Sequence, residues 1–438
     1  MDENLSKVIS DVSIFAEGHL VHGNLVIGPD GRIAAIEETP CTNDSTCWLL
    51  PGVIDAHVHF REPGLTQTAD IASESRAAAA GGVTYVLDMP NVKPTTTSPE
   101  ALAEKHRLFK KKCIVNYGLW YGITVNNIDE ALALYGQPDS PHRDEICGFK
   151  VFLGSSTGGM LMNDQQKLCQ LFAGTQRVVG IHSESEDIIR RNADQYREMF
   201  AGQDVPVEYH PKIRSTEACM ATTSMAVGLA KETGAQLHVC HITTADELEL
   251  MGSTPNITGE VCVAHLWFSD KDYQRLGTRI KCNPAIKTMQ DREALCRGLT
   301  DGRIYSIATD HAPHLLSDKQ GGALRAASGM PSIQFSLLSM LELCRQGVLP
   351  LSRVVELMCK HPAERFGLAG RGEIRVGNYA DLVLVNPNAS TSVNKENILS
   401  KCGWSPFEGT TFSHRILGTW VNGRQVFQSN LSNYSNPS

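Results

Sequence analysis

His57 and His59 stand two residues apart, where an apolar run that begins at Pro51 gives way to the turn Pro63-Gly64. On an extended strand such a pair points to one face, which is the spacing needed to hold one metal ion from one side. The same pair could instead be two strand histidines that pack or face water. Because α/β enzymes collect their chemistry at the carboxyl ends of strands, the metal hypothesis depends on ligands from later strands.

Later apolar runs do supply such residues. Candidate strands end at His182, His241 and Asp310, and Lys150 stands inside another apolar run. His238 and His241 differ by three, so they face opposite ways on a strand. We prefer His241 because it comes last, and we expect His238 to pack against helices. Imidazoles and carboxylates suit zinc, and more ligands than one ion needs suggest two ions.

Lys150 has two interpretations. A lysine in an apolar run cannot comfortably keep its charge. It could snorkel, burying its stem and reaching water at the mouth of the fold. Alternatively, burial neutralises the amine, which adds carbon dioxide and becomes a carbamate, an anionic ligand able to bridge two cations.

The elements that must position these residues alternate between strand and helix across the middle of the chain. Strand candidates cover 53–58, 83–89, 114–121, 148–153, 178–182, 236–241, 257–265 and 304–310. A helix is expected after Asp70, and another begins at Ser98-Pro99, where serine caps and proline fits the first turn. Eight buried strands separated by helices predict an α/β fold, a (β/α)8 TIM-like barrel; a doubly wound sheet is the alternative.

Both ends of the chain differ from its middle in their pattern of apolar and polar residues. Residues 7–37 alternate apolar and polar side chains around turns, and this pattern returns at 379–386 and 419–427, where Asn422-Gly423 predicts a hairpin. Neither end is long enough to be stable alone. We therefore expect a small β-sandwich domain built from residues 1–50 plus 369–438, with a catalytic barrel of residues 51–368 inserted between them.

Composition narrows the function classes. The chain has 438 residues, of which 42% are hydrophobic and 20% charged, so it can bury a large core. Its first residues lack a signal-peptide pattern and no apolar run could span a membrane, so we expect a cytoplasmic protein with no membrane partner. The 13 cysteines are scattered singly and are expected to be reduced thiols. A net charge of -8 without a basic run argues against nucleic acid as a partner.

Several stretches together resemble the amidohydrolase superfamily, in particular class I dihydroorotases of the stand-alone bacterial type. The resemblance covers nearly the whole chain, and its most specific stretches are 57–64, 88–91, 148–157, 283–287, 308–314 and 403–409. It implies one metal ion held by His57, His59 and Asp310. It implies a second ion held by His182 and His241. Carboxylated Lys150 would bridge two Zn²⁺ per subunit.

The resemblance also implies an activity. Class I dihydroorotases interconvert N-carbamoyl-L-aspartate and L-dihydroorotate in pyrimidine biosynthesis, with a hydroxide between the ions as nucleophile in ring opening. Asp310 would then be the catalytic residue that carries the proton between nucleophile and leaving nitrogen. A homodimer is the assembly that the family suggests, and the small-molecule substrate is the expected partner.

Substrate contacts implied by the resemblance must include a site for a carboxylate that does not react. Arg61, two residues after His59, offers a bidentate fork for it. The other implied contacts are Asn91, Asn283, His314, Ser328 and Gly329. Without the family, these residues could be a surface arginine, turn residues and a loop histidine. Related allantoinases usually carry asparagine at the Arg61 position, and hydantoinases lack the Arg-Glu-Pro-Gly pattern.

Three function classes stay open at this point. Dihydroorotase is the principal hypothesis, and another cyclic amidohydrolase acting on allantoin or a hydantoin is the alternative enzyme. The third is an inactive dihydroorotase-like scaffold; such members usually lose metal ligands, whereas this chain keeps all six positions. After Lys150, the polar segment 154–159 suggests that Ser156 or Thr157 closes over the substrate.

Overall fold

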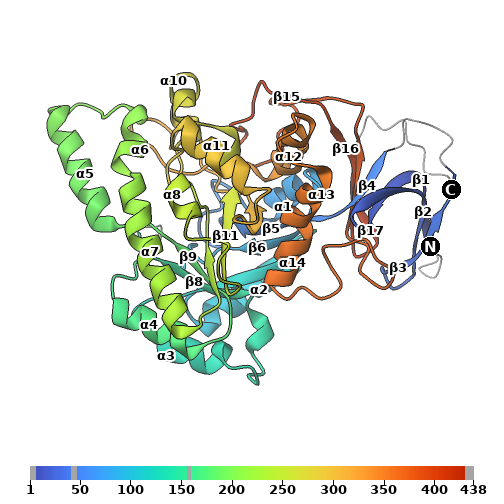
Figure 1. Cartoon of the computed structure of the whole chain (residues 1–438), viewed down its shortest axis with the longest axis horizontal. Helices are drawn as coiled ribbons and strands as arrows, with labels where there is room; N and C mark the ends of the chain where they lie inside the picture. The colour runs from blue at the N-terminus through green and yellow to red at the C-terminus, as the bar shows by residue number, and fades with distance from the viewer. Residues whose placement is uncertain (1–5, 41–46, 155–158, 430–438) are drawn as a thin grey trace.

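The structure is a computed structural model that describes residues 6–40, 47–154 and 159–429. Ser156 and Thr157 lie outside these residues. Figure 1 shows a barrel wrapped in helices and, to its right, a sheet in which the blue first strands and the red last strands lie together. The predicted fold class is confirmed: a (β/α)8 barrel stands beside a small β-sandwich domain built from both chain ends.

Eight parallel strands form the barrel and follow one another in chain order around it. They are β5 (Val53–Val58), β6 (Val83–Asp88), β7 (Asn116–Gly122), β8 (Gly148–Phe152), β9 (Val179–His182), β10 (Leu237–Val239), β11 (Ile257–Cys262) and β12 (Ser306–Ala308). A parallel bridge between Val58 and His311 joins the first strand to the chain just after the last one. The His59 amide also donates to the His311 carbonyl at 2.8 Å, so the ring of strands closes beside the predicted metal ligands.

Helices connect the strands and cover the outside of the barrel. They are α1 (Ile71–Ala80), α2 (Pro99–Lys112), α3 (Ile128–Ala131), α4 (Gln165–Gly174), α5 (Glu186–Met199), α6 (His210–Ile213), α7 (Thr216–Thr233), α8 (Ala245–Leu248), α9 (Val263–Trp267), α10 (Tyr273–Leu276), α11 (Met289–Gly298), α12 (Ser336–Arg345), α13 (Leu351–Val355) and α14 (His361–Arg365). The predicted helix starts are confirmed. Asp70 accepts from the Ser73 amide and Ser98 from the Ala101 amide, caps that each stabilise a helix by about 1 kcal/mol.

The seven-stranded sheet of the β-sandwich domain has the order β17-β16-β13-β4-β1-β2-β3. Its strands are β1 (Lys7–Ala16), β2 (His19–Ile27), β3 (Ile33–Glu38), β4 (Trp48–Pro51), β13 (Leu382–Asn386), β16 (Arg415–Val421) and β17 (Arg424–Gln428). β13 pairs with both β4 and β16, which joins the two chain ends. The predicted Asn422-Gly423 hairpin is present, with both residues at positive φ. The domain limits at 50 and 368 stay predictions.

One further hairpin lies outside that sheet. β14 (Thr391–Ser392) pairs with β15 (Thr411–Phe412), and the chain between them returns to the barrel. Phe412 and Phe407 pack against the barrel residue Phe335. The last part of the chain therefore contributes to the barrel as well as to the β-sandwich domain.

Several predicted strands end earlier than expected. The 257–265 strand stops at Cys262, and α9 begins at Val263, so His265 is helical. The 236–241 strand stops at Val239, so His241 follows the strand instead of ending it. Asp310 likewise lies two residues beyond β12. No helix among the described residues is long and apolar enough to cross a membrane, and each cysteine described is a free thiol.

Candidate metal centre and active site

A cavity of about 580 Å³ opens among the loops that follow the barrel strands. All the predicted site residues except Lys150 line it: His57, His59, Arg61, Asn91, His182, His241, Asn283, Asp310, His314, Ser328 and Gly329. Residues from most of the barrel's circumference thus meet in one place. Lys150 is fully buried.

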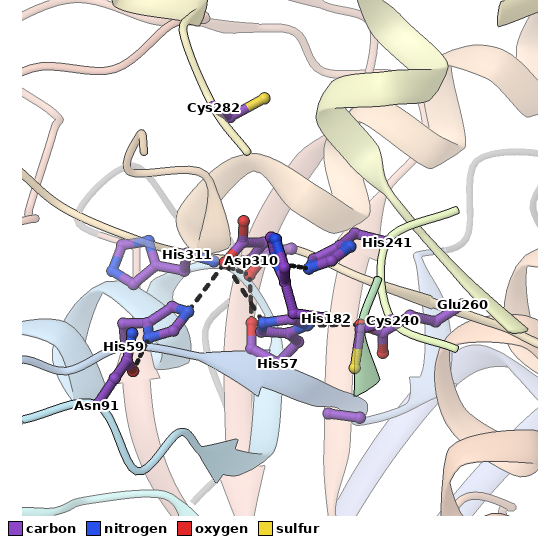
Figure 2. A network of polar contacts seen from close by, with 12 residues as sticks. His57, His59, Asn91, His182, Cys240, His241, Glu260, Cys282, Asp310 and His311 are labelled. Atoms are coloured by element: carbon purple, nitrogen blue, oxygen red, sulfur yellow. Dashed lines mark hydrogen bonds and ion pairs between the residues drawn. The ribbon is translucent and has the colours of Figure 1, made fainter. Parts of the chain in front are cut away.

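His57, His59 and Asp310 form a compact group in which one ligand atom of each lies within 4.8 Å of the others. Asp310 Oδ1 is 2.9 Å from His59 Nε2 and 3.4 Å from His57 Nε2 (Figure 2). His57 lies in β5 and His59 directly follows its last residue, and Asp310 reaches them because β12 is the strand next to β5 in the closed ring.

A buried carboxylate fixes the orientation of His57. Its Nδ1 donates to Glu260 Oε1 at 2.6 Å, and Glu260 also accepts from His238 Nε2 at 3.2 Å. His57 Nε2 is then left to face Asp310. Cys240 and Glu260 form a second possible metal group with His57. Glu260 in that group already accepts a hydrogen bond from His57 Nδ1, so the set with Asp310 fits a cation better.

His59 shows the same arrangement with a neutral acceptor. Its Nδ1 donates to Asn91 Oδ1 at 2.7 Å. Burial lowers the pKa of His59 to about 4, although Asp310 opposes the shift, so the ring is neutral at pH 7. Its Nδ1 is engaged with Asn91, and its Nε2 lies 2.9 Å from Asp310 Oδ1. An imidazole nitrogen and a carboxylate oxygen are donors that suit a divalent cation such as zinc.

His182 and His241 approach each other on the far side of His57. His182 Nε2 donates to Glu184 Oε2 at 2.9 Å, which leaves Nδ1 facing His241 Nε2 at 3.0 Å. Burial lowers the pKa of both rings, which are therefore neutral. Arg214 forms an ion pair with Glu184. The two facing nitrogens, within hydrogen-bond distance of each other, are placed to share one ion, and a carboxylate holds one ring, as is usual for ligating histidines.

Lys150 lies in β8 with no exposed surface. Its Nζ contacts Cys240 Sγ at 3.0 Å and stands 5.2 Å from the centre of the Phe152 ring. Within the described part of the chain it forms no ion pair with a carboxylate. A buried amine without a counterion is costly as an ammonium. The burial rules out the snorkelling interpretation, and the chemistry of the donor set fits a carbamate ligand.

The charges around His57 favour a cation at this place. Burial lowers the pKa of His57, but the carboxylates of Glu260 and Asp310 outweigh it and raise the pKa to about 10. Burial also acts to raise the pKa of Asp310, yet His57 and His59 hold it below its usual range. The carboxylates of Glu260 and Asp310 therefore favour a positive charge at this place, and a metal ion would supply one.

Backbone conformation sets three of the site residues apart. Arg61, His241 and Asp310 have φ values of 65°, 43° and 47°, in the left-handed region that residues other than glycine adopt rarely. Such conformations cost about 1–3 kcal/mol each and persist where the surrounding structure enforces them, often at active sites. They explain why His241 and Asp310 point into the cavity although their strands have already ended.

Arg61 and His314 form the wall next to the metal group. Arg61 is buried; its Nε donates to the Pro313 carbonyl at 3.2 Å and its Nη2 donates to His314 Nε2 at 3.1 Å. Burial and the Arg61 charge lower the pKa of His314 to about 3, so its ring is neutral and accepts this bond. The guanidinium keeps further N–H donors. An anion in the cavity could use them.

Asn283, Ser328 and Gly329 come from two adjacent backbone segments. The Gly329 amide donates to the Lys281 carbonyl at 2.9 Å, which ties 327–329 to 281–283. Gly329 has φ 131°, and a side chain there would meet the Ala312 carbonyl oxygen at 2.6 Å. Asn283 Oδ1 is buried, and no described residue donates a hydrogen bond to it. The structure thus brings these predicted contacts to the same cavity wall.

Sequence reasoning missed the carboxylates that hold the ligand histidines. Glu260 stands in β11, the apolar run Ile257–Cys262, just as Lys150 stands in β8. A charged residue inside an apolar run could therefore have identified Glu260 from the sequence. Glu184 follows His182 by two residues, and this spacing would have suggested its bond to the ring. His238, expected to pack against helices, bonds Glu260 and Thr258 and also packs against Phe366.

A family profile described as the amidohydrolase family matches residues 48–160 and 182–426. The chain belongs to the amidohydrolase family. It is accordingly a hydrolase that acts on a small molecule, and amidohydrolases generally bind metal, in keeping with the histidine and carboxylate groups described above.

Named relatives of this amidohydrolase divide between activities. The chain is 34% identical to a dihydroorotase of Methanosarcina mazei over 90% of this chain and 87% of that protein. It is 33% identical to an allantoinase of Solibacter usitatus over 96% of this chain and 93% of that protein. Among solved structures, the L-hydantoinase of Arthrobacter aurescens matches with a TM-score of 0.87 and 25% identity over 96% of both chains. These relatives support a cyclic amidohydrolase, within which the substrate has to be argued from the site.

Proposed function

We propose that this amidohydrolase is a dihydroorotase, which interconverts N-carbamoyl-L-aspartate and L-dihydroorotate in pyrimidine biosynthesis. The observation that carries the proposal is the buried Arg61 guanidinium beside the His57, His59 and Asp310 group. L-Dihydroorotate carries a ring carboxylate that takes no part in the reaction, whereas allantoin and hydantoin carry none. A buried arginine with free donors is suited to bind that carboxylate in a bidentate way.

The metal assignment is part of the proposal. His57, His59 and Asp310 would hold one Zn²⁺, His182 and His241 a second, and carboxylated Lys150 would bridge them. When bound, the two ions supply a water-derived nucleophile near neutral pH and polarise the reacting carbonyl. The supporting observations are the converging histidine nitrogens and the buried Lys150 amine without a counterion.

Asp310 is the proposed proton carrier. It lines the cavity, and the neighbouring histidines keep its pKa low, so it is ionised at neutral pH. In ring opening the carboxylate accepts a proton from the attacking nucleophile and passes it to the ring nitrogen as the amide bond breaks. In ring closure it accepts the proton of the attacking ureido nitrogen.

The remaining contacts would orient the substrate. Asn91, whose carbonyl oxygen accepts from His59, lines the cavity together with Arg61 and His314 and would contact the substrate carboxylate. The buried Asn283 oxygen is an acceptor for a ureido or ring N–H, and the Ser328 and Gly329 backbone would complete that side. The family resemblance further suggests a homodimer in the cytoplasm, and both stay predictions.

Allantoinase is the second candidate, because an allantoinase relative matches as much of the chain at nearly the same identity. Arg61 favours dihydroorotase, since neutral allantoin would leave a buried guanidinium without an anionic partner. A hydantoinase activity and an inactive scaffold are less well supported. All six proposed metal-binding positions are present, whereas scaffold members of the family usually lose them.

The test is a substrate panel on the zinc-loaded protein. Ring opening of L-dihydroorotate, allantoin and hydantoin is followed with the same enzyme preparation, and kcat/KM is compared. We expect L-dihydroorotate to be preferred by about 100-fold or more, the scale expected when a buried charged group is otherwise left unpaired. Preference for allantoin or hydantoin would refute the proposal, and no turnover of any cyclic amide would favour the scaffold.

A further inference from the structure

Lys319 is a buried lysine held by main-chain oxygen atoms. Its Nζ donates to the carbonyls of Lys281, Ala327 and Gly329 at 3.0, 2.7 and 2.8 Å. Only 2% of its surface is exposed, and within the described residues its amine forms no ion pair with a carboxylate. An ammonium group has three donors and no acceptor, so these three carbonyls satisfy it completely.

The three carbonyls belong to the two segments that carry proposed substrate contacts. Lys281 lies two residues before Asn283, while Ala327 and Gly329 flank Ser328. The Gly329 amide donates to the Lys281 carbonyl, and Lys319 donates to the Lys281 and Gly329 carbonyls from the same side. One amine therefore sets the distance between the two segments.

Trp404 links this lysine to the carboxylate wall. Its buried ring centre is 5.8 Å from Lys319 Nζ, and its Nε1 donates to the His314 carbonyl at 2.8 Å. Trp404 belongs to the 403–409 stretch, whose role the proposed chemistry leaves unexplained. The Lys401 amide donates to the buried Glu74 carboxylate at 2.9 Å and fixes this stretch against the barrel.

We propose that Lys319 is a positioning residue, which with Trp404 holds segments 281–283, 314 and 327–329 at the separation that fits the cyclic amide. The identity of these segments as substrate contacts rests on the proposed function. Lys319 itself touches no substrate, because main-chain oxygens use all its donors. Loops that hold a ligand lose affinity when their spacing is not enforced.

The variant Lys319→Met keeps the length and the apolar stem of the side chain and removes the three donors. The three carbonyls then face one another without a cation, and the two segments move apart. We expect KM for the best cyclic amide of the panel to rise about tenfold or more, while kcat and zinc content change little. A side chain that only stabilised the fold would lower the amount of active protein and leave KM unchanged.

Hydrogen exchange gives a second measurement that needs no substrate. Lys319→Met should increase amide deuterium exchange in 281–283 and 327–329 and leave the barrel strands protected. Lys287→Met is the matched control, because Lys287 is also buried but donates to the Ala285 carbonyl at 3.1 Å. It should change neither KM nor exchange in 327–329.

Trp404→Phe tests the contribution of Trp404. It keeps an aromatic face near Lys319 and loses the bond to the His314 carbonyl, so KM should rise about threefold, as for one lost hydrogen bond. Trp267→Phe, in the neighbouring aromatic cluster, is its control. If Lys319→Met does not fold, Lys319→Gln, which keeps two donors, is tested by the same criteria.

Unchanged KM together with unchanged exchange in 327–329 would overturn the inference. The outcome is separate from that of the proposed function. A wild-type protein that prefers allantoin would refute the dihydroorotase assignment, yet the exchange measurement, and KM on allantoin, would still decide the role of Lys319.

Discussion

Side chains hold the half of the cavity that we propose binds metal, whereas backbone carbonyls hold much of the half that we propose binds substrate. His57 is oriented by Glu260 and His182 by Glu184, and each of these ligands lies in a barrel strand. Arg61, by contrast, is fixed partly by the Pro313 carbonyl. The difference suggests that the chemistry is built into the barrel, while the choice of substrate is set by loops that can vary without disturbing the metal ligands.

Among the substitutions that test this difference between the two halves of the cavity, Arg61→Asn is expected to have the largest effect. Removing the buried guanidinium should lower kcat/KM for L-dihydroorotate about 100-fold, mainly through KM, because the substrate carboxylate loses its charged partner. Zinc content should stay unchanged, and activity on allantoin should not fall. Arg190→Met is the control, since this exposed arginine on α5 also lines the cavity. A loss of zinc in Arg61→Asn would break the separation between the two halves.

Glu260→Gln should affect the half of the cavity that is proposed to bind metal. His57 then loses the charged acceptor of its Nδ1 proton, and zinc affinity should fall about 10- to 100-fold. KM of the fully loaded enzyme should remain close to that of wild type. The measurement is a chelator competition followed by kinetics at saturating zinc. Glu247→Gln is a matched control, because that buried glutamate bonds threonines and no ligand histidine. Equal zinc affinities of Glu260→Gln and wild type would contradict the role given to Glu260.

These experiments test a site that the sequence anticipated unevenly. Strand spacing alone left His57 and His59 open to a packing role, and residues after later strands made them metal candidates. β5 forms where the apolar run predicts it and ends at Val58, directly before His59. His241 was chosen by its position, and the physical reason is different from strand alternation: β10 ends at Val239 and a left-handed residue turns the side chain inward. The alternation of side chains along a strand does not predict such a turn, so only the structure explains why His241, and not His238, lines the cavity.

Contacts between distant backbone segments were beyond sequence reasoning. No spacing in the sequence marks Lys319. Its partners are main-chain carbonyls of residues 38, 8 and 10 positions away, and the side chains of those residues do not indicate the contact. The barrel and the joining of the chain ends could be predicted, because both depend on hydrophobic patterns. The details of the loops could not, because they depend on where backbone groups find partners.

The smallest expected effect concerns stability in acid. Burial would raise the pKa of Glu184, but Arg214 and His182 outweigh it and lower the pKa from 4.5 to about 2. The unfolded chain therefore binds this proton first as pH falls, so the stabilisation is complete above pH 4.5 and is lost between about pH 4.5 and 2.

Urea unfolding of the metal-free protein at pH 7 to 3 measures most of this contribution, on the order of 2 kcal/mol between pH 4.5 and 3. Glu184→Gln should be less stable at pH 7, and its stability should fall less steeply with acid. Asp187→Asn, which alters an exposed carboxylate in the first turn of α5, should follow the wild-type slope. Parallel slopes for Glu184→Gln and wild type would contradict the assignment.

The central claim is that a bridged pair of zinc ions at the converging histidines opens the dihydroorotate ring. Its most direct test is zinc content together with L-dihydroorotate ring opening, for wild type and Lys150→Ala. We predict about two zinc ions per wild-type chain, and a variant that loses zinc and at least ~10⁴-fold in activity. Partial recovery of the variant with a short carboxylic acid would support the carbamate. A Lys150→Ala protein that keeps two ions and full activity would contradict the account.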